Sequence, residues 1–200
     1  MVAINFKVLF QRVLELLASP EQTWRAIQKE PDPGRALMVR YTALLALLPA
    51  LVGLLGGLAS GQGFLASLVL ALLRSGIAFG TAWTLALMLN SLAPSFGTVR
   101  SQNAALKLVS YASTPVWVAG LLTIIPPLLP LAALAGFGYT AFLLHGGCQR
   151  LMDTPREKAW PFALTLTGIW FFKVLVLSWF VALAASSLLA PATPIAPPTP

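Results

Sequence analysis

Five long apolar stretches alternate with short polar links along the 200 residues of the chain. They cover about residues 37–59, 64–92, 106–125, 128–146 and 159–189. At about 1.5 Å per residue, an α-helix of such a length crosses a hydrocarbon core of roughly 30 Å. The pattern therefore predicts an all-α membrane protein, a bundle of five transmembrane helices.

Residues 1–36, before the first span, predict two shorter helices. From 3 to 18, apolar residues follow a helical period and polar residues return on the opposite side, which is typical of an amphipathic helix. Ser19 precedes Pro20 and is expected to cap a second helix, which ends before Pro31. The amphipathic helix has two interpretations: it lies in the membrane interface among the lipid headgroups, or it packs against the cytoplasmic end of the bundle.

Composition supports a membrane protein and argues against other classes. Hydrophobic residues make up 58% of the chain and charged residues 10%, whereas soluble domains have about 45–50% and 25%. The net charge of +7 does not predict nucleic-acid binding, because the basic residues are spread along links beside the spans. The spans form one domain, 37–189, and the proline-rich tail, 190–200, is predicted to be extended and disordered.

The basic residues gather on one side of the predicted bundle. All but two of the 13 lysines and arginines lie before or at the start of the first span, in the link that leads into the third span and its first residues, or in the link after the fourth. By the positive-inside rule, the N-terminus is then cytoplasmic and the C-terminus outside, in a protein integral to the cytoplasmic (inner) membrane. The two exceptions, Arg74 and Lys173, lie within spans and near the middle of the bilayer.

A cation at that depth needs polar partners, because its insertion costs at least about 2.5–3.5 kcal/mol. No acidic residue lies within a span, which leaves backbone carbonyls, hydroxyls, water or a bound anion. Two interpretations stay open: the cations snorkel and hydrogen-bond within the fold, or they hold an anion or a lipid headgroup. The candidate anion or lipid site contains Arg74, Lys173, Ser75, Thr81, Thr84 and Thr167.

Enzyme chemistry finds no support in the residue pattern. The one histidine, His145, has no carboxylate near it in sequence, and the one cysteine, Cys148, is expected to be an inert small residue or a site of reversible lipidation. No catalytic motif or metal-ligand spacing occurs, so no catalytic residue, cofactor or metal site is predicted. Gly76 and Gly80 are spaced for close helix packing, within the chain or between copies.

Two runs of sequence carry a resemblance to a known family. Residues 107–117 contain a tyrosine-alanine-x-threonine-proline run, and residues 152–159 contain a threonine-proline-x-x-lysine-alanine run. In this order and beside five spans, they resemble the Yip family of membrane proteins, the Ypt/Rab-interacting group. The positions that match are Tyr111, Thr114, Pro115, Thr154, Pro155 and Lys158.

The resemblance implies a five-helix integral membrane protein with no known enzymatic activity. Eukaryotic relatives bind small GTPases and act in vesicle traffic and membrane shaping, but this chain lacks their long polar N-terminal segment, which argues against GTPase binding and for a bacterial-type member. We expect a non-enzymatic scaffold that organises membrane lipids or binds membrane proteins, other copies of itself included. The alternatives are a small transporter, channel or lipid-handling protein that uses Arg74 and Lys173, or an accessory subunit.

Overall fold

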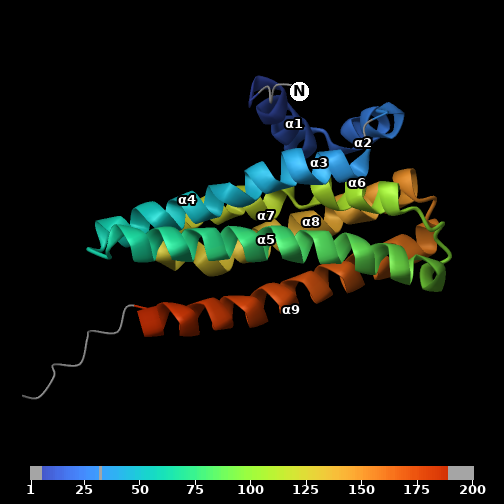
Figure 1. Ribbon diagram of the computed structural model, residues 1–200. Helices are drawn as coiled ribbons and strands as arrows, with labels where there is room; N and C mark the ends of the chain where they lie inside the picture. The colour runs from blue at the N-terminus through green and yellow to red at the C-terminus, as the bar shows by residue number, and fades with distance from the viewer. Residues whose placement is uncertain (1–5, 32, 189–200) are drawn as a thin grey trace, which may run out of the picture.

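The computed structural model describes residues 6–31 and 33–188, which form helices joined by short links, with no strand among them (Figure 1). The predicted tail, 190–200, and residues 3–5 of the predicted amphipathic helix lie outside this description. Five helical stretches are long and apolar enough to cross a bilayer, which confirms the predicted fold class. They are Gly34–Ala59, Phe64–Phe96, Gln102–Leu122, Leu129–Leu151 and Arg156–Ser186.

The described residues contain nine α-helices, some of which join into one span. In chain order they are α1 (Phe6–Ala18), α2 (Pro20–Lys29), α3 (Gly34–Leu37), α4 (Ala43–Ala59), α5 (Phe64–Leu92), α6 (Gln102–Ala112), α7 (Thr114–Ala119), α8 (Leu129–Leu151) and α9 (Arg156–Leu188). A π-helical segment, Met38–Thr42, joins α3 to α4 within the first span, and 3-10 segments follow α5 and α7.

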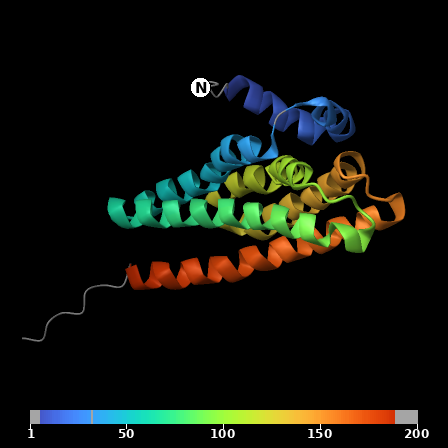
Figure 2. The same ribbon diagram turned by 45° about the vertical axis from the view of Figure 1, so that its right-hand side comes forward.

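The spans lie side by side and alternate in direction (Figures 1 and 2). The turn from α4 to α5 and the 3-10 segment Pro126–Leu128 before α8 lie at one end, on the left in Figure 1, and carry no charge. The α5–α6 link, with Arg100, and the α8–α9 link, followed by Arg156, lie at the other end. We call these the uncharged end and the charged end of the bundle.

The third span forms the core of the bundle. In its most apolar stretch 67% of the residues are buried, against 11% in the fifth span. All eight residues from 105 to 112 are buried on α6, which contacts α3, α5 and α8. The outer helices instead expose large apolar side chains, such as Leu65 and Leu134 at 73% and 74%. Such an apolar exterior is suited to lipid rather than water.

A break divides the third span at Ser113, between α6 and α7. Pro115 lies in the first turn of α7, where its missing N–H leaves no hydrogen bond unmade, and the chain turns there as the proline predicts. The third span begins at Gln102, earlier than the predicted 106, because the Ser101 hydroxyl oxygen accepts the Ala104 N–H at 3.2 Å and caps α6.

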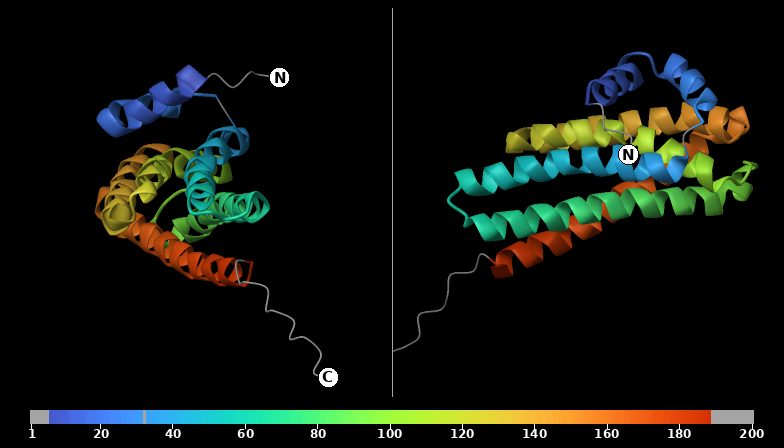
Figure 3. Two further views of the ribbon diagram at one scale, coloured as in Figure 1. Left: turned by 90° about the vertical axis from the view of Figure 1, so that its left-hand side faces the viewer. Right: turned by 45° about the horizontal axis from the view of Figure 1, so that its top comes forward.

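Helices α1 and α2 lie across the bundle instead of along it. Viewed down the spans, the pair extends crosswise beside them (Figure 3, left). The contacts lie well inside the spans: α1 meets α7, and the Tyr139 hydroxyl, in the middle of α8, donates to the Leu17 carbonyl at 2.8 Å. The buried faces carry Val13 and Leu16 on α1 and Trp24 on α2.

The predicted capping of α2 by the Ser19 side chain is wrong. Pro20 begins the helix as expected, but the Ser19 side chain makes no capping hydrogen bond. Instead its carbonyl accepts the Thr23 hydroxyl at 2.8 Å, and the same hydroxyl lies 3.0 Å from the Glu15 carbonyl. The turn between α1 and α2 is thus stabilised by the hydroxyl of Thr23, a residue of α2, and not by the Ser19 side chain.

Gly146 and Gly147 let α2 approach α8 closely. The Trp24 ring lies over both glycines, and a β-carbon added at Gly147 would come within 2.9 Å of Trp24 Cζ2 and 2.2 Å of Leu108 Cδ1. Gly147 therefore leaves room for both side chains. Helix α8 continues to Leu151, past the predicted limit of 146. By contrast, β-carbons at Gly76 and Gly80 would meet no described atom within 4 Å, so those glycines serve no close packing within the described chain.

Replacing Gly147 with alanine should therefore destabilise the bundle. The added methyl group overlaps Trp24 and Leu108, and we expect a loss of about 1–3 kcal/mol, measured as a lower unfolding midpoint in mild detergent. Gly76→Ala is the matched control, and it should be neutral or stabilising by up to about 1 kcal/mol through helix propensity. Equal midpoints for the two variants would contradict this packing.

Candidate functional site

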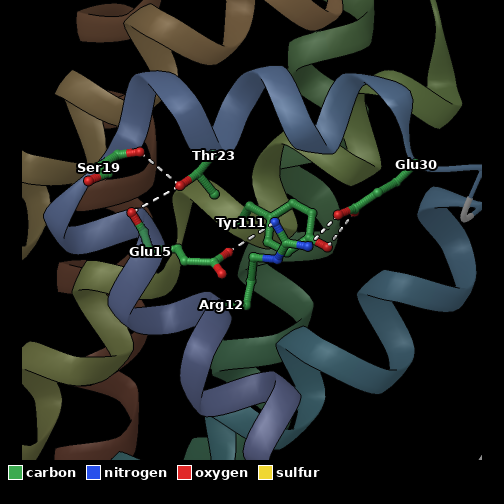
Figure 4. Close-up of polar contacts among 6 residues, drawn as sticks. All are labelled: Arg12, Glu15, Ser19, Thr23, Glu30 and Tyr111. Atoms are coloured by element: carbon green, nitrogen blue, oxygen red, sulfur yellow. Dashed lines mark hydrogen bonds and ion pairs between the residues drawn. The ribbon is translucent and has the colours of Figure 1, made fainter.

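A polar cluster around Glu30 fastens the α1–α2 pair to the third span (Figure 4). Glu30 follows α2, and one of its carboxylate oxygens pairs with the Arg12 guanidinium of α1. The other accepts a hydrogen bond from the Tyr111 hydroxyl of α6 at 3.2 Å. Arg12 also lies 3.3 Å from Glu15, so its charge is shared between two carboxylates.

The conformation of Glu30 follows from the proline after it. Pro31 excludes helical geometry at Glu30, whose φ of −73° and ψ of 130° are extended. The Glu30 carbonyl therefore does not point along the axis of α2. It accepts a hydrogen bond from the Lys107 ammonium of α6 at 2.6 Å. Lys107 is only 5% exposed, and a buried ammonium requires such acceptors.

Tyr111 and Thr114 extend the cluster into the first span. The Thr114 hydroxyl donates to the Tyr111 carbonyl at 2.7 Å, so it is free to accept from the Tyr41 hydroxyl, 2.8 Å away. The rings of Tyr41 and Tyr111 meet edge to face at 5.0 Å, and the Arg12 guanidinium lies 5.7 Å from the centre of the Tyr111 ring. We call Arg12, Glu30, Tyr41, Lys107, Tyr111 and Thr114 the Glu30 cluster.

The second sequence motif joins two links at the charged end. The Thr98 hydroxyl donates to the Thr154 hydroxyl at 2.9 Å, and the Thr154 N–H donates to the Cys148 carbonyl at 3.2 Å. Gly97 has a φ of 67°, and a β-carbon added there would lie 3.6 Å from both Pro155 and the Lys158 ammonium. Thr154, Pro155 and Lys158 thus hold the α8–α9 link against the α5–α6 link.

The predicted anion site is only partly assembled. Lys173 of α9 meets α5, where its ammonium donates to the Thr81 carbonyl at 3.2 Å and to the Thr84 hydroxyl. The Thr81 hydroxyl also accepts the Trp170 indole N–H at 3.4 Å. Protein oxygens therefore satisfy part of the hydrogen-bonding capacity of the Lys173 ammonium, as expected for a lysine within an apolar helix.

Arg74 lies elsewhere, against α4. A β-carbon added to Gly53 would come within 2.5 Å of an Arg74 guanidinium nitrogen, so the absence of a side chain at Gly53 makes room for it. The buried hydroxyl oxygens of Ser75 and Thr167 have no hydrogen-bond partner among the described residues. The structure thus unites Lys173 with two of the predicted hydroxyl residues and leaves Arg74 apart from them.

Residue counting along the two helices gives the axial place of the Lys173 contact. Thr84 lies about 20 residues, or roughly 30 Å of helix, from Phe64 at the uncharged end of α5. Lys173 itself lies about midway along the fifth span, Arg156–Ser186. Its depth near the middle of the bilayer stays a prediction.

His145 and Cys148 are both engaged on α8. The His145 ring stacks on Trp160 with centres 4.2 Å apart, and its Nε2 lies 2.9 Å from the Gln149 amide nitrogen. Because that nitrogen can only donate, His145 Nε2 accepts. Cys148 is fully buried. Within 6–31 and 33–188, no three His, Cys, Asp or Glu side chains gather as a metal site would require.

Sequence reasoning missed the Glu30 cluster. In the sequence, Arg12 and Lys107 are two of the basic residues that predict the orientation, and Glu30 precedes the proline before which the second helix ends. The one available signal was Tyr111, a motif position whose hydroxyl needs a partner if it is buried in a span. That partner comes from a segment 81 positions away, which no local pattern identifies.

A helical bundle with five bilayer-length apolar stretches and an exposed apolar surface defines an integral membrane protein. A family model described as the Yip1 domain matches residues 14–180, from α1 to α9. The chain belongs to the Yip1 domain family, which confirms the resemblance inferred from the two motifs. Neither a curated protein nor a solved structure matches the chain.

Removing the Glu30 carboxylate should loosen the α1–α2 pair. In Glu30→Ala, Arg12 and Tyr111 lose a shared acceptor, and we expect a loss of roughly 1–3 kcal/mol in the attachment of the pair. Hydrogen exchange would show faster exchange in α1 and α2 and unchanged protection in α8. Glu157→Gln, at an exposed carboxylate of α9, is the control. Unchanged exchange of α1 in Glu30→Ala would refute the role of the cluster.

Proposed function

We propose that this protein is a non-enzymatic scaffold that organises the membrane in which it is embedded. Its charged end faces the cytoplasm and its C-terminus lies outside, in the cytoplasmic (inner) membrane, because the basic residues gather at the charged end. Membrane lipids are its principal partners, with other membrane proteins or further copies of the chain as secondary ones. The proposal requires no cofactor, no nucleic acid and no small GTPase.

The observation that carries this proposal is that α1 is buried on one side and exposed on the other. One side, with Val13 and Leu16, is buried against the bundle. The exposed side carries the apolar Phe10 and Leu14, which are 62% and 49% exposed, and next to them polar side chains such as Gln11. Because α1 runs across the spans, its axis is roughly parallel to the membrane plane (Figure 3, left). Exposed apolar side chains beside polar ones, on a helix in that orientation, fit a position among the lipid headgroups.

The depth of α1 supports the interfacial interpretation over a cap on the charged end. Tyr139, which donates to the Leu17 carbonyl, and Tyr111, which lies beside Arg12, are both inside their spans. Helix α1 therefore lies beside the spans, level with the cytoplasmic part of the bilayer. Inserted from one leaflet only, it widens that leaflet and favours curved membrane.

Exposed apolar side chains of α1 should therefore direct the protein to curved membrane. We would reconstitute the chain in giant vesicles, with its charged end on the outer leaflet, and pull a thin membrane tether. The wild type should be enriched in the tether relative to the flat membrane, and Phe10→Ser/Leu14→Ser should lose this enrichment. The reason is that the two serines remove the apolar area which enters the headgroup region.

The matched control is Phe10→Leu/Leu14→Ile, which keeps both positions apolar and should retain the enrichment. Hydrogen exchange would verify that α1 stays folded and attached in both variants. A serine variant that is still enriched in the tether, with α1 attached, would rule out insertion of α1 as the source of membrane organisation.

A second candidate function, lipid or anion handling, is favoured by the Lys173 contact. The ammonium meets Thr84 in an exposed contact, where a lipid phosphate or a passing anion could also reach it. In proteoliposomes, the wild type should then move labelled lipid between leaflets or pass anions, and Arg74→Leu/Lys173→Leu should lower the rate to that of protein-free vesicles. Arg100→Leu, at the charged end, is the control. Wild-type rates no faster than protein-free vesicles would exclude this function.

A further inference from the structure

A cleft of about 550 Å³ opens at the charged end, between the start of α2, the last turns of α8 and the α8–α9 link. Its walls include the aromatic rings of Trp24 and Phe142 as well as charged side chains. The charged side chains that border it are Glu21, Arg150, Asp153 and Arg156. Two positive and two negative groups thus surround one opening.

These four charges do not pair with one another. The ion pairs of Arg12 with Glu15 and with Glu30 involve none of the four. Solvent-accessible charges of opposite sign gain little by pairing across a cleft, so all four stay available to a ligand. The arrangement is therefore complementary to a ligand that carries an anionic and a cationic group together.

The cleft lies at the level of lipid headgroups. From Leu129 at the uncharged end to Arg150 is about 20 residues of helix, or roughly 30 Å, the thickness of the hydrocarbon core. The same face of α8 continues toward the uncharged end as an apolar surface, on which Phe142 and Leu134 are 41% and 74% exposed. Gly138 lies between them and is also exposed, so an extended chain has room there.

Asp153 lies in an unusual backbone conformation at the edge of this cleft. Its φ of 51° makes it the one non-glycine residue with a positive φ in the described chain. Glycine adopts this conformation without steric cost, whereas other residues pay on the order of 1 kcal/mol. An aspartate tolerates it and in addition supplies a carboxylate to the cleft.

We propose that the cleft binds the headgroup of a zwitterionic aminophospholipid, such as phosphatidylethanolamine. Arg150 and Arg156 bind the phosphate, and Glu21 and Asp153 bind the primary ammonium. The acyl chains leave the cleft along the exposed apolar face of α8, past Phe142. This site does not depend on insertion of α1, so the two proposals fail independently.

Native mass spectrometry of the full-length protein in mild detergent tests the site. With phosphatidylethanolamine, phosphatidylcholine and phosphatidylglycerol added in equal amounts, we expect the first to be retained about tenfold more than the others, because it alone combines phosphate with a hydrogen-bonding ammonium. Arg150→Gln/Arg156→Gln should abolish retention. Glu21→Gln/Asp153→Asn should remove the preference, and asparagine keeps the left-handed backbone.

Matched controls remove the same charges outside the cleft. Arg25→Gln/Arg100→Gln and Glu157→Gln alter exposed residues near the charged end and should leave retention unchanged. Phe10→Ser/Leu14→Ser should also retain the lipid, which separates this site from the role of α1. Unfolding midpoints would verify that each variant is folded.

Three results would overturn the proposal. Equal retention of phosphatidylglycerol and phosphatidylethanolamine would show an anion site without a role for the carboxylates. Retention that survives Arg150→Gln/Arg156→Gln would place the lipid elsewhere. Displacement of the lipid by an equal concentration of soluble phosphorylethanolamine would show a site for a free metabolite, because the apolar face of α8 would then contribute nothing.

Discussion

The structure depends on one contact between distant segments. The Glu30 carboxylate accepts a hydrogen bond from the Tyr111 hydroxyl of the third span and forms an ion pair with the Arg12 guanidinium of α1. Both charged side chains are largely buried, with 20% and 22% of their surfaces exposed. Charges so placed are costly unless they are paired and hydrogen-bonded. The pair therefore specifies one position for α1 on the bundle, where a purely apolar contact would allow several.

The bundle surrounds this contact with packing suited to a lipid solvent. The third span, broken at Ser113, is the most buried of the five, while the other spans expose leucine, phenylalanine and valine. Glycine at 147 lets Trp24 close over α8, which brings α2 and the Glu30 carbonyl to Lys107. Both Yip-family motifs have structural roles in this arrangement: Tyr111 and Thr114 in the cluster, Thr154 and Lys158 between the links at the charged end.

Hydrophobic periodicity was enough to predict the five spans, because burial in lipid demands long apolar helices whatever their neighbours are. The same reasoning failed where contacts join distant segments. The sequence places Lys107 at the start of the third span and Glu30 at the end of a short helix, and only the folded chain shows that they meet. Likewise, no local pattern indicated that Lys173 would meet Thr81 and Thr84 of α5, or that Arg74 would lie apart from them, against α4.

The most direct test of this account is a distance measurement across the Glu30 contact in a lipid bilayer. Spin labels at Gln11 on α1 and Leu134 on α8, both exposed, would be measured by double electron–electron resonance in nanodiscs. The account predicts one narrow distribution that matches the structure and broadens in Glu30→Ala. A broad distribution in the wild type, or a narrow one that Glu30→Ala leaves unchanged, would contradict it.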